Sequence, residues 1–373
     1  MSCIVKFGRS LLGTIVALRT LTVTVIPMFC ASVMSAGVSS EAFDIRVERS
    51  IRPGKDKAVC RRLIGIVGDG EKVNDVIFCG LSSAAESNVV FFGGDVQDYK
   101  ENMMNHRDNH RYKEWNLEST AQLLHKRFPK SHVWVVKPSR MHLKTFSVYQ
   151  NFVESNDFGA PTHNSDHGGF KHLNALLHNA ISMARLPGKC SSDCDNGSVD
   201  LEKKYSSDHQ KESGLGEQNG ELSKGVCAVS NGQNSISVEC SLEKPLILSA
   251  FSKGCIVLNQ FIYELENAKE EPELKDLVEK IHSLYWLDGG HSGGSNTWIV
   301  HLFVLKNLIG LNLNVFVHVT PYQIRDEMRV WIGKEERKFV DRLQKMGVKV
   351  TEVVHFDEEE RSLCNHFNVL TNF

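Results

Sequence analysis

The sequence lacks the features that mark several large functional classes. Its 373 residues carry a formal net charge of −2, so no excess of positive charge attracts nucleic acid or an acidic membrane. It contains no G-x-x-x-x-G-K-S/T loop, no G-x-G-x-x-G sequence after an expected strand and no H-E-x-x-H helix. These absences exclude common nucleotide-binding and zinc-protease signatures. We therefore expect no nucleic-acid partner and no cofactor.

The cysteines indicate neither a disulfide scaffold nor a zinc site. There are ten in the chain, and Cys190 and Cys194 are not followed by a second Cys or His pair at zinc spacing. The polar run His163–His167 is more typical of a helix N-cap, formed by Ser165 or Asp166, than of a metal cluster. We therefore expect no metal. This cysteine usage suits a reducing or intracellular compartment.

The first forty residues contain no Asp or Glu. They hold Lys6, Arg9 and Arg19 among many Ser and Thr, which is typical of a mitochondrial transit peptide. The apolar run Leu21–Met34 leaves a secretory signal peptide open, and Leu11–Ala36 leaves a membrane anchor open, although Arg19 interrupts it. We interpret residues 1–40 as a cleavable leader, with mitochondrial import favoured over secretion. We expect no stable transmembrane span in the mature chain.

Residues 41–373 read as one domain in which strands and helices alternate. Short apolar runs predict strands at Phe43–Val47, Leu63–Val67, Val76–Cys79, Asn88–Phe92, His132–Val136, Pro245–Ala250, Leu284–Leu287, Leu313–Thr320 and Lys349–Phe356. Helical periodicity predicts helices at Leu117–Arg127, Phe170–Met183, Gly254–Lys269, Leu274–His282, Thr297–Leu308 and Lys334–Lys345. This alternation predicts an α/β-hydrolase-like fold, a mostly parallel sheet with helices on both faces. Functional loops then lie at the carboxyl ends of the strands.

Residues 188–242 interrupt this pattern. They are rich in Ser, Gly, Asn, Asp, Lys and Glu and have almost no aromatic residues. Such a segment cannot bury enough apolar surface to offset the entropy lost on ordering. We expect a disordered surface insertion here.

The clearest local signal is Leu248–Cys255, where an expected buried strand runs directly into a helix. In such a turn the central residue, Ser252, has its hydroxyl above the sheet and can act as a nucleophile. The residues two before and two after it must be small, and they are Ala250 and Gly254. Glycine is usual at both positions, so Ala250 is a departure. The alternative is an ordinary helix N-cap at Ser252.

A serine nucleophile needs a base, and in this fold the base is a histidine that follows the acid in the chain. The downstream histidines are His282, His291, His301, His318, His355 and His366. We favour His366, in an expected loop after the last strand. An ordinary surface histidine near the C-terminus remains the alternative.

Two carboxylates could orient that base. Asp326 lies in a loop after the expected strand Leu313–Thr320, the commonest place for the acid, and is favoured. Asp288, the alternative, ends the preceding strand at the start of a glycine-rich loop. Asp326 could instead pair with Arg325 or Arg329.

Tetrahedral oxyanions need backbone N–H donors. One donor is expected at Lys253, directly after the nucleophile. The other is expected in the glycine-containing loop after the strand that ends at Phe92, from the backbone of Gly94 or Asp95.

Short segments spread over most of residues 88–373 match one family. They are Phe92–Tyr99, His132–Lys137, Ser139–Leu143, Asn151–Val153, Phe158–Pro161, Phe251–Cys255, Tyr285–Trp298, His318–Arg325, Trp331–Lys334 and Asn365–Phe367. Through them the chain resembles the vertebrate family designated chromosome two open reading frame sixty-nine, esterase-like mitochondrial proteins. The resemblance implies a location in the mitochondrial matrix and a link to respiratory function. It implies no substrate.

Three functions remain open. The first is a mitochondrial serine hydrolase that cleaves a small acyl ester or thioester through an acyl-Ser252 intermediate. The second is a catalytically silent hydrolase fold that binds or regulates a protein partner. The third is a lipid-surface protein with residues 139–187 as a lid and the leader as an anchor. The order Ser, Asp, His in the expected loops favours the first.

Overall fold

The computed structural model describes residues 58–186, 237–291 and 293–373. They belong to one compact unit, Pro53–Phe373. The expected leader, the expected strand Phe43–Val47 and residues 188–236 of the expected insertion lie outside the described residues. Of the helices in the described ranges, none combines the length and the apolar character needed to cross a membrane.

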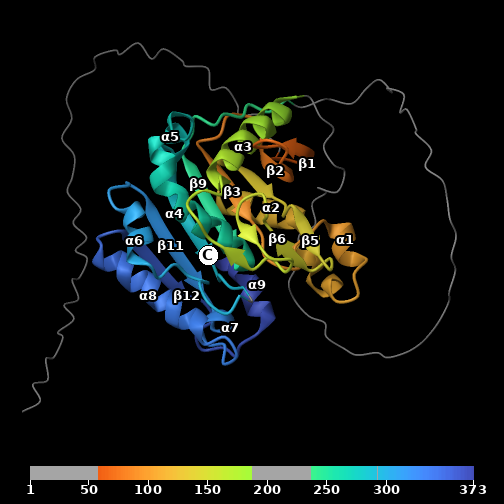
Figure 1. The fold of residues 1–373 in the computed structure, drawn as a ribbon. Helices are drawn as coiled ribbons and strands as arrows, with labels where there is room; N and C mark the ends of the chain where they lie inside the picture. The colour runs from red at the N-terminus through yellow and green to blue at the C-terminus, as the bar shows by residue number, and fades with distance from the viewer. Residues whose placement is uncertain (1–57, 187–236, 292) are drawn as a thin grey trace, which may run out of the picture. The chain divides into compact units, whose positions relative to one another are not determined.

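An eight-stranded sheet forms the centre of the described chain, in the order β1-β2-β4-β3-β9-β10-β11-β12 (Figure 1). Its strands are β1 (Ala58–Val67), β2 (Val73–Leu81), β3 (Ser87–Phe92), β4 (Ser131–Val136), β9 (Leu246–Phe251), β10 (Ile281–Leu287), β11 (Asn314–Val319) and β12 (Lys349–Val354). Only β2 runs against its neighbours, and the other pairs are parallel. Two short hairpins, β5 (Arg140–His142) with β6 (Phe146–Val148) and β7 (Glu154–Ser155) with β8 (Pro161–Thr162), follow β4.

Helices cover both faces of this sheet. They are α1 (Lys100–Met104), α2 (Leu117–Arg127), α3 (Gly169–Arg185), α4 (Cys255–Glu270), α5 (Pro272–Glu279), α6 (Leu302–Leu305), α7 (Pro321–Ile324), α8 (Trp331–Lys345) and α9 (Leu363–Asn372), with 3-10 turns at Asn109–Trp115, Ser252–Gly254 and Lys306–Leu308. Successive side chains of a strand face opposite sides. Phe92 and Trp286 therefore enter a core with α3, α4, α5 and α8, whereas Phe91 and Leu287 enter a second core with α2 and α9. The predicted α/β-hydrolase fold is confirmed.

The expected strands within the described residues are all strands of this sheet, but two expected helices differ. The helix expected over Leu274–His282 ends at Glu279, because Ile281 pairs with Leu246 and begins β10. The helix expected from Thr297 starts only at Leu302. The backbone before it is held in another conformation by Glu335, whose carboxylate accepts the N–H groups of Thr297 and Trp298 at 2.8 and 3.2 Å. Long-range bonds thus override local helical periodicity.

The expected insertion, residues 188–242, ends earlier in the chain than predicted. Residues 237–242 lie in the described part, and Val238, Cys240 and Leu242 are buried in the larger core. The guanidinium of Arg185 donates to the Cys240 carbonyl at 2.9 Å, which ties this segment to the end of α3. A segment whose alternate side chains are apolar can be ordered by their burial despite its polar neighbours.

Candidate active site

Ser252 directly follows β9 and begins the 3-10 turn Ser252–Gly254, which leads into α4. Its φ is +52°, a left-handed conformation that is strained for a residue other than glycine and is typical of functional sites. A Cβ added to Gly254 would lie 2.2 Å from the Phe92 carbonyl oxygen, so the start of the helix packs directly on the end of β3. Ala250 is fully buried within β9, where a methyl group is accommodated. The small residues around Ser252 are thus explained by close packing.

A hydrogen-bonded chain links three buried side chains at this point. His366 Nε2 lies 3.0 Å from Ser252 Oγ, and His366 Nδ1 lies 2.6 Å from Asp288 Oδ2. Ser252, His366 and Asp288 are 8%, 4% and 0% exposed. Charge-assisted hydrogen bonds of this kind are short and strong. The structure therefore brings together Ser252 and His366 with Asp288, the alternative acid.

Asp288 is itself held by a neighbouring strand. Its carboxylate accepts the Thr320 N–H at 2.7 Å and the Thr320 hydroxyl at 2.6 Å. Because β10 and β11 are parallel with Leu287 opposite His318, the residues that follow each strand end side by side. Thr320 was not singled out by sequence reasoning. The register of these two strands is the signal that identifies it.

Asp326, the favoured acid, is not brought to His366. Its Oδ2 accepts from Arg329 Nε at 2.8 Å and lies 3.2 Å from a guanidinium nitrogen of Arg361. Burial alone would raise the pKa of Asp326, but the hydrogen bonds from Arg329 and the Met328 N–H outweigh it and lower the pKa below its ordinary value. Helix α7 intervenes between β11 and Asp326 and carries it away from the end of the strand. The ion-pair alternative describes Asp326, and the preference for it as the acid is corrected.

His366 occupies a helix, not the loop expected from the sequence. Helix α9 begins after Ser362, whose hydroxyl accepts the Asn365 N–H at 3.0 Å as an N-cap. The His366 ring lies against Phe251 and Tyr322, with ring centres 4.5 and 4.8 Å apart. The helix forms because its apolar face, which includes Phe367, is buried in the second core.

The expected oxyanion donors are not equivalent. The Gly94 N–H donates to Gln97 Oε1 at 2.9 Å, so this amide is engaged within its own loop. A Cβ added to Gly94 would lie 2.6 Å from Ser252 Cβ, so glycine lets the loop approach the serine. Lys253 lies in the first helical turn, where N–H groups have no acceptor within the helix. The backbones of Asp95 and Lys253 thus remain the predicted pair of donors.

The segment expected as a lid, residues 139–187, is packed into the core along much of its length. Helix α3 lies within residues 139–187, but its Leu173, Leu176 and Leu177 are fully buried in the larger core. A lid that included this helix would have to open the core. The remaining part, which carries the hairpins β5–β6 and β7–β8, is anchored in the same way, because Tyr149 and Phe152 are also fully buried in that core.

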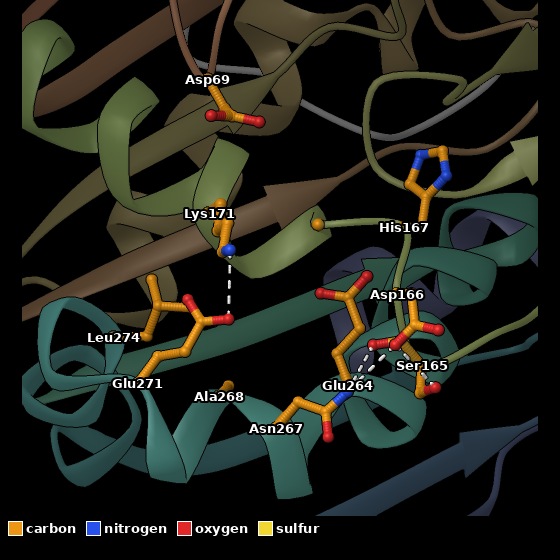
Figure 2. Close-up of a pocket in the computed structure, with 11 residues that line it drawn as sticks. Asp69, Ser165, Asp166, His167, Lys171, Glu264, Asn267, Ala268, Glu271 and Leu274 are labelled. Carbon is orange, nitrogen blue, oxygen red and sulfur yellow. Dashed lines mark hydrogen bonds and ion pairs between the residues drawn. The ribbon is translucent and has the colours of Figure 1, made fainter.

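A separate cavity of about 290 Å³ lies between the start of α3 and α4 (Figure 2). Its charges are satisfied locally: Lys171 Nζ lies 3.1 Å from Glu271, and Asn267 donates to Asp166 at 3.2 Å. The carboxylate of Glu264 accepts the N–H groups of Gly169 and Phe170 at 2.8 and 2.9 Å. Glu264 therefore caps α3, instead of the expected Ser165 or Asp166. None of Ser252, His366 and Asp288 lines this cavity.

Comparison with known proteins agrees with the family resemblance. The C2orf69 family model matches residues 62–349. The human "Mitochondrial protein C2orf69" is 41% identical over 332 residues, which are 87% of this chain and 85% of the relative. The homologue from Danio rerio, also named as mitochondrial, is 37% identical over 329 residues, 84% of this chain and 85% of the relative.

Solved structures of esterases show a distant similarity. Brefeldin A esterase, described as a bacterial homologue of human hormone sensitive lipase, is 12% identical, with 89% of this chain and 76% of that chain covered and a TM-score of 0.37. Esterase Est22 is 10% identical, with coverages of 84% and 75% and a TM-score of 0.39. At such scores the fold assignment rests on the strand order and not on these neighbours. On the family match and the relatives' identity, the chain belongs to the C2orf69 family.

Proposed function

We propose that this protein is a serine hydrolase that cleaves a carboxylic ester or thioester through an acyl-Ser252 intermediate. The observation that carries the proposal is the continuous hydrogen-bonded chain from Ser252 through His366 to Asp288. Ser252 is the nucleophile on a strained strand–helix turn, a nucleophile elbow. His366 is the base, and Asp288 orients it.

The residues define a balanced reaction. His366 Nε2 accepts the Ser252 hydroxyl proton as Oγ bonds to the substrate carbonyl carbon. The carbonyl oxygen becomes an oxyanion, which accepts hydrogen bonds from the Asp95 and Lys253 N–H groups. His366 then gives the proton to the leaving group as the bond between that group and the carbonyl carbon breaks. The atom that receives the proton is the oxygen of an ester or the sulfur of a thioester, so an alcohol or a thiol leaves. Water repeats the sequence on the acyl-enzyme, releasing a carboxylic acid and restoring Ser252.

Each part contributes a separable share of the rate. An oxyanion donor contributes about 3 kcal/mol of transition-state stabilisation. Asp288 holds the Nδ1–H tautomer of His366, so that Nε2 faces Ser252 as the acceptor. No step calls on a metal or cofactor.

We place this activity in mitochondria, in the matrix, in support of respiratory function. The support is that the relatives are named as mitochondrial proteins, together with the basic, acid-free residues 1–40. The substrate is a small acyl ester or thioester.

A second candidate is a catalytically silent hydrolase fold that binds or regulates a protein partner. The observation that favours it is the Gly94 N–H, which is occupied by Gln97 and leaves fewer amides for an oxyanion. The departure from glycine at Ala250 points the same way.

Fluorophosphonate labelling of the full chain distinguishes the two. We expect the wild type to be labelled and Ser252→Ala to lose the label. Ser249→Ala is the matched control, because Ser249 is fully buried in β9, the strand that leads to Ser252, and its hydroxyl has no hydrogen-bond partner in the described structure. An unlabelled but folded wild type would contradict the enzyme proposal and support the binding module.

A further inference from the structure

The side chain of Lys253, the residue after Ser252, is buried instead of solvated. Only 2% of it is exposed. Burying an ammonium group is costly unless charged and polar partners replace water. Nζ lies 2.7 Å from Asp95 Oδ1 and donates to the Phe158 carbonyl at 2.8 Å. It also lies 5.0 Å from the centre of the Phe146 ring, a cation–π distance.

Asp95 also accepts hydrogen bonds from Ser147, besides its contact with Lys253. Its Oδ1 accepts the Ser147 N–H at 2.7 Å and the Ser147 hydroxyl at 3.0 Å. Asp95 follows Gly94, whose backbone packs against Ser252. One carboxylate oxygen therefore joins the loop after β3, strand β6 and the residue after the proposed nucleophile.

We propose that the Lys253–Asp95 ion pair is a positioning device that fixes the two oxyanion-binding amides relative to each other and to Ser252. Each member of the pair carries one of these amides on its own backbone. The ion pair between the two side chains therefore links the two backbone segments that would bind the oxyanion. Displacing either amide stretches this ion pair, and the Lys253 ammonium, whose side chain is 2% exposed, then has little water to replace the Asp95 carboxylate, which is itself 31% exposed. The inference rests on the proposed function, because this spacing matters only if an oxyanion forms.

The bonds to Phe158 and Ser147 add a second constraint. They tie the same ion pair to the segment that carries the hairpins β5–β6 and β7–β8. A Cβ added to Gly159, between β7 and β8, would lie 2.3 Å from the carbonyl oxygen of Ser147 in β6, so the two hairpins are also packed on each other. The pair is thus held from both sides and cannot rotate towards solvent without breaking these contacts.

The test compares Lys253→Met, Asp95→Asn and the double variant in the full chain. Lys269→Met is the matched control, because Lys269 lies in α4, is half-buried and donates to the Asn307 carbonyl at 2.7 Å. The readouts are the second-order rate of fluorophosphonate labelling, kcat and KM for a p-nitrophenyl butyrate probe, and the thermal midpoint.

We expect Lys253→Met to slow labelling by about 100-fold, since a misplacement of about 1 Å in an active site has an effect of this size. The loss should appear in kcat and not in KM, and the double variant should be no slower than the slower single variant. Asp95→Asn keeps the size of the side chain and decides the matter should Lys253→Met not fold, with at least about 10-fold slower labelling expected.

Two results would overturn the inference. If the wild type is labelled and the folded variants react within about threefold of it, as expected for Lys269→Met, the ion pair does not position the amides, while the proposed function stands. If the wild type itself is not labelled and hydrolyses no probe, the proposed function fails and this inference fails with it.

Discussion

Asp288 Oδ2 lies 2.6 Å from His366 Nδ1, although the two residues are 78 positions apart in the chain. Asp326, which is 38 positions nearer to His366 by its number, is paired with Arg329 and Arg361 instead. One carboxylate thus faces the imidazole and the other faces guanidinium groups. Their roles can therefore be tested independently.

Asp288→Asn should lower the rate of fluorophosphonate labelling by about 10⁴-fold, because an amide no longer selects the Nδ1–H tautomer of His366. Asp326→Asn should label within about threefold of the wild type, since its carboxylate bonds to Arg329, Arg361 and the Met328 N–H and not to His366. Both rates are measured on folded protein checked by circular dichroism. A larger loss in Asp326→Asn than in Asp288→Asn would reverse the assignment of the acid.

The conformation of Ser252 predicts a trade between stability and activity. Its positive φ suits glycine, so Ser252→Gly should be more stable to urea than Ser252→Ala by about 1 kcal/mol. Neither variant should be labelled, since both lack the hydroxyl. Equal unfolding free energies for the two variants would show that the turn is not strained.

The two small residues beside Ser252 should respond differently. Gly254→Ala places a methyl group against the Phe92 carbonyl and should lower the free energy of unfolding by about 1–3 kcal/mol, together with labelling. Ala250→Gly introduces the usual glycine, and we expect it to keep the label. Urea unfolding and labelling rates measure both effects, and a neutral Gly254→Ala would contradict the close packing at this turn.

Acid should destabilise the fold through histidines that are buried in the neutral form. Burial lowers the pKa of His172 from 6.5 to about 4, and its Nδ1 accepts the Asp69 N–H at 3.2 Å. A histidine with a lowered pKa binds more protons when unfolded, so its stabilisation is complete above pH 6.5 and is lost as the pH falls towards 4. This one group accounts for a loss of about 1–3 kcal/mol over that window.

The variant His172→Gln tests this, because glutamine can keep a donor and an acceptor in place. The unfolding free energy of this variant should fall less steeply between pH 6.5 and 4 than that of the wild type. His178→Gln, an exposed change in the same helix, is the control and should leave the slope unaltered. Parallel slopes for the wild type and His172→Gln would assign the acid sensitivity to other groups.

The apolar pattern was sufficient to predict the sheet, because buried strands such as β3 and β4 each contain four consecutive apolar residues, 89–92 and 133–136. Ser252 was identifiable because the strand–helix turn is local and its small neighbours are visible in the sequence. The acid was not, because two aspartates follow neighbouring strands and only the register of β10 and β11, and the extra turn α7, decide which one reaches the imidazole. The buried Lys253 could not be predicted either, since its partners are Asp95 and Phe158, far from it in the chain.

The proposed base depends on a single ten-residue helix, α9, whereas Ser252 and Asp288 are set by strands of the sheet. Helix α9 is attached through rings, including Phe367 stacked on Tyr112 and Trp115, with ring centres 5.3 and 5.0 Å apart. Detachment of this helix would separate the imidazole from the serine while the central strands keep their hydrogen bonds. Fraying of α9 would therefore inactivate the proposed site at a lower temperature than global unfolding. Hydrogen exchange of the α9 amides would measure the fraction of molecules in which this helix is docked and His366 is in place.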